Sequence, residues 1–483
     1  MTTICRETKL CRETRQRLLA GALALGLVQG VAAQDYNEQP TPEELAKLGL
    51  EGTELTPTGA IRAGNADGTI PAWKNEPVQP PAGWQPGGWH ADPFADDQVL
   101  FTITAQNYKE HADRLSPGQQ KLFETYPDYF MNVYPTRRSA VYQQHLYEAA
   151  LENAGRARIV MSETYPNLIG FEGALKAWAF PIPKNGPQAL MNHTSRPTIL
   201  WKNTVENTTP ITSSGDYETV KLNIQYNLRW SDPSNTLENY DPTVPGSAYL
   251  YYQTTVAPAK QAGQVILVRE PQSFAKQFRQ AWSYSPGQRR VKRAPQIVYD
   301  NPYTSADGLA TTDQKGGFNG PNDRFEWTLL GRKEMYVPYN AYKLWAPEVK
   351  IPDMITDQGR LNQDLARYEL HRVWVLEAKL REGTRHDYGR RQFFLDEDTW
   401  AIMISDGYDR RNALWRIWEE HGLMMYDQGV WDSLPSPVAL QYDLNAGRML
   451  LTNVDKEVPI DFNWRVDAES YFTPAQVRRG GLR

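Results

Sequence analysis

The residue types that most often catalyse reactions or bind metal ions are few in this chain and widely spaced. None of the seven histidines lies three or four residues from another, so no two of them share one face of a helix. They are His90, His111, His145, His193, His371, His386 and His421. The chain also lacks the Gly-x-Ser-x-Gly elbow, the His-Glu-x-x-His zinc helix, the phosphate loop and the dinucleotide fingerprint. The sequence therefore predicts no catalytic residue, no metal site and no cofactor.

One carboxylate run, Asp396-Glu397-Asp398, has the residue types of a calcium site or of an acid/base pair. It lacks the glycine and the distal glutamate of a calcium loop. A glycosidase pair is defined by the separation of two carboxylates in space, which a sequence does not show. Because the run lies between two strand patterns, we interpret it as a solvated hairpin turn.

The most concentrated positive charge lies in the run from Pro286 to Arg293. Its arginines could bind the phosphate or carboxylate groups of anionic head groups or of an acidic partner. The simpler interpretation, which we favour, is a solvated face that pairs with neighbouring acids. The whole chain has 52 Lys and Arg against 57 Asp and Glu, a net charge of -5. We therefore expect no nucleic-acid binding, which needs a basic surface.

The only two cysteines, Cys5 and Cys11, lie in an N-terminal segment with the pattern of a bacterial secretory signal. Five basic residues flank the apolar stretch Leu18 to Val28, and Val31-Ala32-Ala33 has the small residues of a cleavage site. The apolar stretch is shorter than the about 20 residues that span a bilayer. An uncleaved anchor or a buried helix is the alternative. The pattern predicts a signal peptide over residues 1–33, a periplasmic protein, and a mature chain with no cysteine, no transmembrane span and a net charge of -8.

The residue pattern of the rest of the chain changes twice along its length. Residues 34–95 are rich in proline and glycine and predict an extended segment with one short helix, capped by Thr41. Helical patterns follow over about 96–160, with helices opened by Ser116 and Ser139. Beyond about residue 215 strands dominate. In the clearest of them, Val220 to Trp230, apolar and polar residues alternate without exception, which predicts one buried and one wet face.

Shorter patterns predict eight further strands. They are Ala248 to Val256, Gln264 to Arg269, Phe325 to Leu330, Arg372 to Leu380, Tyr388 to Leu395, Trp400 to Ile404, Ala413 to Trp418 and Val438 to Leu444. Short turns join several of them, and this spacing indicates antiparallel neighbours, because parallel strands need crossovers of about a dozen residues. One helix, Leu361 to His371, is predicted among the strands.

These elements predict an α+β fold, mostly antiparallel β, in a single domain over residues 96–483. Its large curved sheet, over about 215–455, would wrap helices on its concave side. A sheet that curls around helices can enclose a cavity, and the aromatic content supports one: 15 Trp, 26 Tyr and 14 Phe. The alternating residues that we expect to line it are Trp374, Leu376, Ala378, Leu380, Trp400, Ile402 and Ile404.

Six short motifs, taken together, resemble a bacterial secreted family, the domain of unknown function 1329, whose members are often labelled outer-membrane lipoprotein-sorting-like. The motifs are Tyr134 to Ser139, Phe180 to Pro183 with Gly186 and Asn192-His193, Ser285 to Val291, Phe318 to Gly320, Lys333 to Asn340, and Arg385 to Arg391. The resemblance implies a fold similar to the lipoprotein carriers LolA and LolB, in which an unclosed antiparallel barrel holds acyl chains. It also implies work beside an RND-type exporter of the envelope.

From the residues and the resemblance we expect a periplasmic, non-enzymatic carrier or chaperone. Its cargo would be hydrophobic, such as a lipid, an acylated molecule or a lipoprotein, since burying each methylene yields about 0.8 kcal/mol. One alternative is an envelope carbohydrate-binding protein or hydrolase that uses aromatic and carboxylate residues. Another is a structural partner in an envelope assembly, which would make contact through residues 34–95.

Overall fold

The computed structural model describes residues 36–303, 305–432 and 438–481. Residues Asn37–Arg483 form one compact unit, and Met1–Tyr36 form a second, of which only Tyr36 is described. The predicted signal peptide, residues 1–33 with both cysteines, therefore lies outside the described residues. Within the described ranges, no helix is both long enough and apolar enough to cross a membrane.

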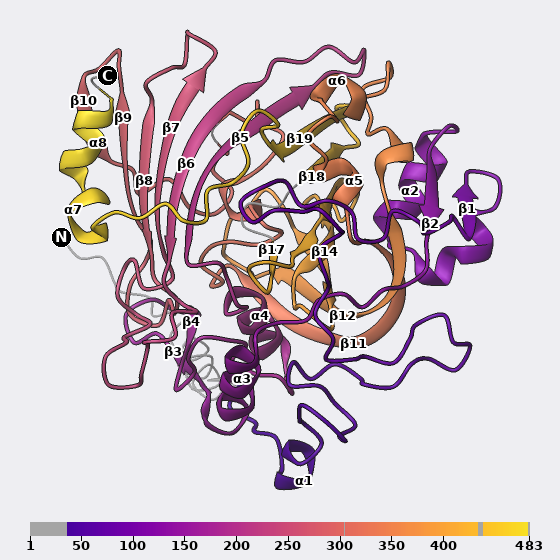
Figure 1. The fold of residues 1–483 in the computed structure, drawn as a ribbon. Helices are drawn as coiled ribbons and strands as arrows, with labels where there is room; N and C mark the ends of the chain where they lie inside the picture. The colour runs from indigo at the N-terminus through magenta and orange to yellow at the C-terminus, as the bar shows by residue number, and fades with distance from the viewer. Residues whose placement is uncertain (1–35, 304, 433–437, 482–483) are drawn as a thin grey trace, which may run out of the picture. The chain divides into compact units, whose positions relative to one another are not determined.

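Fifteen strands of the larger unit form one sheet (Figure 1). They are β1 (Phe101–Thr104), β2 (Phe130–Val133), β5 (Trp201–Ile211), β6 (Val220–Leu228), β7 (Tyr249–Ala257), β8 (Val265–Glu270), β9 (Gln280–Ser285), β10 (Arg290–Arg293), β11 (Phe325–Pro338), β12 (Tyr368–Leu380), β13 (Arg390–Asp396), β14 (Ile402–Tyr408), β15 (Leu414–His421), β18 (Val438–Asp443) and β19 (Arg448–Val454). Two short hairpins lie outside it: β3 (Arg158–Met161) with β4 (Ile169–Glu172), and β16 (Leu423–Met425) with β17 (Val430–Asp432).

The strand order of the large sheet is β1-β2-β12-β13-β14-β15-β18-β19-β5-β6-β7-β8-β9-β10, with β11 also paired to β12. All of its pairs are antiparallel except the short contact of β2 with β12. The two ends, β1 and β10, are not paired with each other, so the sheet is unclosed. β11 and β12 bend together through a long arc (Figure 1). The prediction of a large, curved, mostly antiparallel sheet is confirmed.

The nine predicted strands correspond to β6, β7, β8, β11, β12, β13, β14, β15 and β18. The sheet also extends beyond the predicted 215–455, because β1, β2 and β5 join it. The predicted helix Leu361 to His371 is wrong: only a short 3-10 turn, η3 (Gln363–Leu365), forms, and β12 begins at Tyr368. The backbone there pairs with β11, with Leu370 opposite Tyr336, and this pairing overrides the helical pattern.

The helices are short. They are α1 (Pro42–Leu45), α2 (Pro117–Thr125), α3 (Gln144–Arg156), α4 (Gly186–Thr194), α5 (Tyr342–Trp345), α6 (Ile351–Met354), α7 (Ala468–Tyr471) and α8 (Pro474–Gly480), with the 3-10 turns η1 (Tyr108–Arg114) and η2 (Thr312–Gln314). The predicted caps Thr41 and Ser116 both form capping boxes. Ser139 does not open α3, which begins five residues later; its hydroxyl donates instead to Asn340 Oδ1 at 2.6 Å.

The helices divide between the two faces of the sheet. On β19, Leu451 packs into the core cluster of α2, whereas its neighbour Leu450 packs against Tyr303 and Leu309 on the other face. We call this second face the cavity face; α4 and the residues 297–319, apart from 304, cover it. The opposite face is covered by α2 near β14 and β15 and by α8 near β8 to β10. The sheet is thus enclosed on both sides over much of its length.

The polar face of β6 was predicted to be wet, and this is wrong for its second half. Gln225 and Asn227 are only 7% and 6% exposed. Gln225 donates to the Asn203 side chain on β5, and the chain after β19 returns there, with the Asp461 nitrogen donating to the Asn203 carbonyl. A C-terminal segment covers a strand face that looked amphipathic, because alternation reports polarity and not what packs on top.

Candidate ligand cavity and buried ion network

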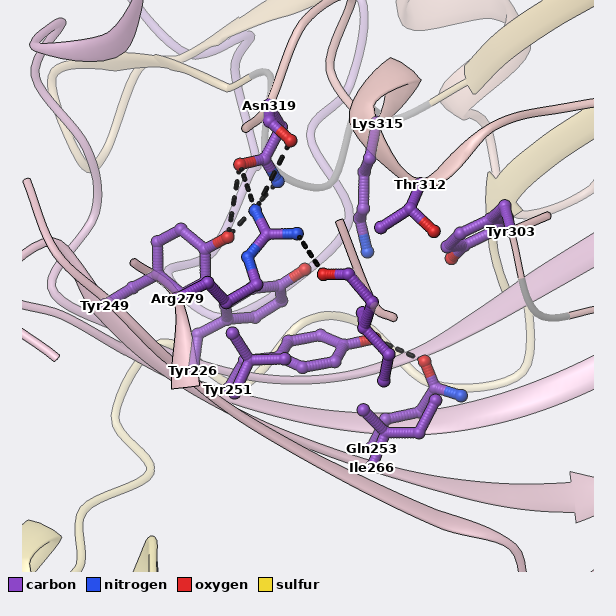
Figure 2. A pocket seen from close by; sticks show the side chains of 12 residues that line it. Tyr226, Tyr249, Tyr251, Gln253, Ile266, Arg279, Tyr303, Thr312, Lys315 and Asn319 are labelled. Atoms are coloured by element: carbon purple, nitrogen blue, oxygen red, sulfur yellow. Dashed lines mark hydrogen bonds between the residues drawn. The ribbon is translucent and has the colours of Figure 1, made fainter. Parts of the chain in front are cut away.

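A cavity of about 60 Å³ lies on the cavity face of β6, β7 and β8 (Figure 2). Its lining residues are Tyr226, Tyr249, Tyr251, Gln253, Ile266, Val268, Arg279, Ile297, Tyr303, Thr312, Lys315 and Asn319. The strand residues come to one face because side chains alternate along each strand and paired residues share a face; Tyr226, for example, pairs with Tyr251. The remaining wall comes from β8–β9 and from the covering chain. The volume holds about two water molecules.

Lys315 is the distinctive residue of this cavity. Its ammonium lies 5.1 Å from the centre of the Tyr251 ring and 5.7 Å from that of Tyr226, in a cation–π arrangement. Its carboxylate partner is Glu206 on β5, at 3.7 Å. Burial alone would lower the pKa of Lys315, but the Glu206 charge outweighs it and raises the pKa well above its ordinary value. Nζ is thus a buried cation, and it makes no hydrogen bond of normal geometry to the described residues.

The second cation of the cavity, Arg279, is fully engaged. It pairs with Glu270 through two nitrogens, of which Nη2 lies 2.8 Å from Glu270 Oε1. The same nitrogen donates to Asn319 Oδ1 at 2.8 Å (Figure 2). The positive charge of Arg279 is therefore neutralised at hydrogen-bond distance, and Lys315 is left as the cation with donor capacity to spare.

A second cavity of about 60 Å³ adjoins the first on the same face. Tyr249, Lys315 and Asn319 line both cavities. The second continues toward the end of α4, where Thr194 and Trp230 line it. Movement of the three shared side chains would join the two spaces into one channel along the sheet.

The carboxylate run Asp396-Glu397-Asp398 is not a solvated turn, contrary to the prediction. All three side chains are at most 2% exposed. Arg138 donates from Nε to Asp398 Oδ2 at 2.9 Å and from Nη2 to Asp398 Oδ1 at 2.6 Å. The predicted extended segment covers the run, since the Ile61 nitrogen donates to Glu397. A chain segment more than 300 residues away in sequence thus buries the turn.

His371 extends this ion network into the core. Nε2 lies 3.2 Å from Glu369 and Nδ1 3.3 Å from Asp396, and the ring stacks on Tyr339 with centroids 3.9 Å apart. Burial lowers the pKa of His371, but hydrogen bonds to Asp396 and Glu369 outweigh burial and raise it to about 9. The imidazole is therefore a cation between two carboxylates at neutral pH. Arg367 continues the network from Glu369 to Asp97.

One group among the described residues has the ligand types of a metal site: His371, Asp396 and Asp398 offer atoms within 4.8 Å of one another. The hydrogen bonds argue for another role. Both oxygens of Asp398 already accept from Arg138, and Asp396 pairs with His371. Two protein cations supply the charge that a metal ion would bring, so this group is an ion-pair network.

A larger hollow, of about 540 Å³, lies between the stretch Trp89–Asp97 and α5. We call it the Trp89 hollow. Aromatic side chains of Trp89, Phe94 and Tyr134 line it beside Asp92 and Asp97. Burial raises the pKa of Asp92. Burial acts on Asp97 in the same direction, but hydrogen bonds from Arg137 and Arg367 outweigh it and lower the pKa of Asp97.

The seven residues expected to line a cavity lie in a different part of the sheet. Trp374 stacks on Trp400 with centroids 5.5 Å apart, and the Arg332 guanidinium covers Trp374 at 4.1 Å. Five of the seven are fully buried: Leu376, Ala378, Trp400, Ile402 and Ile404. The other two, Trp374 and Leu380, are half-buried. None of the seven lines the cavities described above. Their assignment to a cargo site stays a prediction.

Sequence reasoning missed Lys315 and named none of the tyrosines of the cavity as a site. Part of the signal was present, because the alternation of the β6 pattern placed Tyr226 on its buried face. Lys315 follows η2 in irregular chain, where no periodicity marks which side chain turns inward. A lysine flanked by Gly316 and Gly317 carries no motif.

The family model described as "Protein of unknown function (DUF1329)" matches residues 102–478. An uncharacterized protein of Pseudomonas aeruginosa is 41% identical over 479 residues, which cover 98% of this chain and 100% of that protein. A solved protein domain from Vibrio parahaemolyticus, described as outer membrane lipoprotein-sorting, is similar with a TM-score of 0.40 and 13% identity, over 61% of this chain and 98% of that one. A LolA superfamily protein from Nitrosomonas europaea gives a TM-score of 0.36 and 10% identity, over 60% and 97%.

Proposed function

This chain belongs to the DUF1329 family, and we propose that it is a periplasmic, non-enzymatic carrier of an amphiphile with an acidic head. The cargo would lie on the cavity face of β6 to β8, and Lys315 would hold its charged oxygen. The observation that carries this proposal is a buried ammonium without a hydrogen bond of normal geometry to a described residue. It lies between two small cavities, the first of which is walled largely by tyrosine and aliphatic side chains.

The chemistry of the walls selects the ligand class. Ile266, Val268 and Ile297 provide apolar surface, and each methylene buried there contributes about 0.8 kcal/mol. A carboxylate or phosphate oxygen beside Lys315 would gain a charge-assisted hydrogen bond, worth about 1.5–3 kcal/mol. A neutral hydrocarbon would gain only the free energy of apolar burial. An acidic amphiphile gains both apolar burial and the charge-assisted hydrogen bond.

Loading requires the cavity to widen, because about 60 Å³ cannot hold an acyl chain. The covering chain is anchored at one point by Asp313, which pairs with Arg391 at 2.9 Å and with His386 at 3.1 Å. Burial raises the pKa of Asp313, but the Arg391 charge outweighs it and lowers the pKa to about 2. We infer that the ion pairs of Asp313 stay intact while the side chains of Lys315 and Tyr249 move aside, so that the two cavities become one.

The direct test is to identify what the protein carries. Protein purified from the periplasm without detergent is examined by native mass spectrometry, and its organic extract is analysed for lipids. The purified protein is then titrated with a dansyl-labelled fatty acid and with the matching dansyl-labelled fatty alcohol. We expect the acid to bind more tightly than the alcohol. Failure to bind either amphiphile, with no lipid in the extract, would overturn the carrier proposal.

Variants at Lys315 test the head-group contact. Lys315→Met should weaken binding of the fatty acid at least tenfold and leave the alcohol unchanged, whereas Lys315→Arg should keep the preference for the acid. Lys379→Met, at an exposed lysine on β12, is the matched control and should bind like the wild type. Equal affinity of wild type and Lys315→Met for the fatty acid would contradict the assignment of Lys315.

A second candidate function, carbohydrate binding in the envelope, is favoured by the Trp89 hollow. Its aromatic side chains beside Asp92 have the chemistry of a sugar site, with apolar platforms next to a hydrogen-bond acceptor. Both Asp97 oxygens are engaged by Arg137 and Arg367, which supports binding over hydrolysis. Calorimetry with soluble peptidoglycan oligosaccharides tests carbohydrate binding. Wild type should release heat on binding, and Asp92→Asn should bind at least tenfold more weakly. Absence of heat with wild type would rule out this second function.

A further inference from the structure

Six exposed cations gather where β9, β10 and the end of α8 meet, at the upper left of Figure 1. They are Arg289, Arg290, Lys292, Arg293, Arg478 and Arg479. We call this set the basic corner. It comprises the β9–β10 hairpin, whose turn includes Arg289, and the last turn of α8. Two parts of the chain almost 190 residues apart therefore present charge of one sign together.

Contacts within the corner fix this proximity. α8 packs against β8, β9 and β10, with Val477 in one core cluster with Tyr284 of β9. The β7–β8 turn lies beside it: a Cβ built on Gly263 would be 3.0 Å from Pro286 Cγ and 4.0 Å from the Gly481 carbonyl oxygen. The hairpin tips and the helix end thus lie at one end of the sheet.

Among the residues that the structure describes, the cations of the basic corner have no acidic partners. The expectation from sequence was a solvated face that pairs with neighbouring acids; the face is solvated, but none of the six side chains forms an ion pair with a described residue. The reason is local composition, since residues 271–299 contain no Asp or Glu and none follows Glu469. This cluster of positive charge belongs to a chain whose net charge is -5. An uncompensated positive patch on an acidic protein attracts a polyanionic surface.

We propose that the basic corner docks the protein onto a membrane surface that carries anionic phospholipid head groups. Clusters of four to eight Lys and Arg bind such surfaces, and each cation contributes about a fivefold gain in affinity. Exposed apolar surface lies at the same end of the sheet: Val256, just before the β7–β8 turn, is 49% exposed. Cations beside an exposed apolar side chain are the combination that an interfacial contact uses.

The same residues oppose a protein partner that would add a strand. β10 is an edge strand of four residues, three of them charged, and charge on a short edge strand prevents strand pairing. Arg293 also lies over the Trp282 ring, at 5.2 Å, and not along the edge. A planar head-group layer, in contrast, can contact hairpin tips and a helix end at once.

This inference goes beyond the carrier proposal and does not require it. Docking depends on the six surface cations, whereas cargo binding depends on Lys315 and the cavity. The two can therefore fail separately. If both hold, the basic corner brings the cavity strands β7 and β8 to the membrane from which an acidic amphiphile would be taken.

Co-sedimentation with vesicles tests the docking. The full-length mature protein is mixed with vesicles of phosphatidylcholine alone or with 30% phosphatidylglycerol, at about 20 mM and at 150 mM salt. We expect binding only to the anionic vesicles, weaker at the higher salt because the charges are screened. The test variant carries Arg290→Gln, Lys292→Gln, Arg478→Gln and Arg479→Gln; Arg289 is kept to leave the β9–β10 turn unchanged, and Arg293 because it packs over the Trp282 ring.

The control variant removes four exposed cations elsewhere, by Lys109→Gln, Lys379→Gln, Arg385→Gln and Arg411→Gln. Both variants change the net charge by the same amount, so only position differs. The test variant should lose about a hundredfold or more in vesicle affinity, and the control less than about fivefold. The test variant should keep wild-type binding of the dansyl-labelled fatty acid. No binding of wild type to anionic vesicles, or an equal loss in both variants, would overturn the inference.

Discussion

Around Asp398 buried charges meet at hydrogen-bond distance, whereas beside the cavity the buried Lys315 ammonium lies 3.7 Å from its carboxylate partner Glu206. The Asp398 region pairs each carboxylate with an arginine or a histidine at 3.3 Å or less. The Lys315 region has tyrosine rings, aliphatic walls and empty volume. The Asp398 charges already have partners at hydrogen-bond distance, whereas the Lys315 ammonium has the longer contact with Glu206 and keeps donor capacity for a ligand. The first region has the chemistry of a structural ion network, and the second has that of the ligand site that we propose.

Breaking the compensated region should have the largest effect. Arg138→Met removes the bidentate partner of Asp398 at a position that is 5% exposed, and leaves the carboxylates Asp398 and Glu397 buried without it. We expect a loss of about 3–5 kcal/mol in the free energy of unfolding, measured with urea. The neighbouring Arg137→Met is the matched control, because the Arg137 side chain is 43% exposed, and it should cost about 0–1 kcal/mol. Equal losses would show that burial of the pair does not matter.

The pH dependence of stability should also report on this network. The pKa of His371 is raised to about 9 in the folded protein, above the ordinary value of about 6.5. Its contribution is therefore fully present below pH 6.5 and is lost as the pH rises through 9, with a total of order 3 kcal/mol. The difference in unfolding free energy between wild type and His371→Gln should shrink between pH 6 and pH 9.5. A difference that stays constant would mean that His371 does not titrate with folding.

The two regions also differ in how far a sequence reveals them. The strand pattern at β6 was clear enough to place Tyr226 on a buried face, because one strand's alternation is local information. The burial of Glu397 could not be predicted, because it depends on the Ile61 backbone, 336 residues away. The same limit explains the strands that were missed: β5 lies between β19 and β6, and its own pattern is interrupted by buried Asn207, Thr208 and Thr209.

The helix errors have the same origin. Leu361 to His371 has helical spacing, but the strand partner that decides its backbone is β11, whose pairing a local pattern cannot show. Ser116 was predicted correctly as a cap because its capping partner, Gln119, lies three residues away. Ser139 was predicted wrongly as a cap, because its hydroxyl donates to Asn340 instead. Elements fixed by near neighbours could be predicted, and elements fixed by distant partners could not.

Removing the cation of the cavity should cost less than removing Arg138. Lys315 forms no hydrogen bond of normal geometry with the described residues, so Lys315→Met breaks no short contact, but it removes the cation that lies 3.7 Å from the buried Glu206 carboxylate. We expect a loss of about 1–3 kcal/mol in unfolding free energy. Thermal melting with and without a fatty acid sharpens the comparison, because the ligand should raise the melting temperature of wild type more than that of Lys315→Met. A loss as large as that of Arg138→Met would place Lys315 among the structural ion pairs.

The smallest effect should come from a single hydroxyl group, and it separates the two regions most cleanly. Tyr226 and Tyr342 are both almost fully buried, at 3% and 1% exposed. The Tyr342 hydroxyl donates to the Met424 carbonyl at 2.7 Å, whereas the Tyr226 hydroxyl, beside the cavity, makes no hydrogen bond of normal geometry to a described residue. Removing a satisfied hydroxyl costs about 1 kcal/mol, and removing an unsatisfied one relieves its desolvation penalty.

Tyr342→Phe should therefore lower the unfolding free energy by about 1 kcal/mol, and Tyr226→Phe should leave it unchanged or raise it slightly. The two substitutions remove the same atom from the same residue type, so volume and apolar area do not confound the comparison. Binding of the fatty acid should reverse the order, because an acidic head beside Lys315 would accept a hydrogen bond from the Tyr226 hydroxyl. Tyr226→Phe should then bind several-fold more weakly and Tyr342→Phe like wild type. A stability loss at Tyr226 equal to that at Tyr342 would mean that its hydroxyl is already satisfied and that the cavity offers a ligand less than we propose.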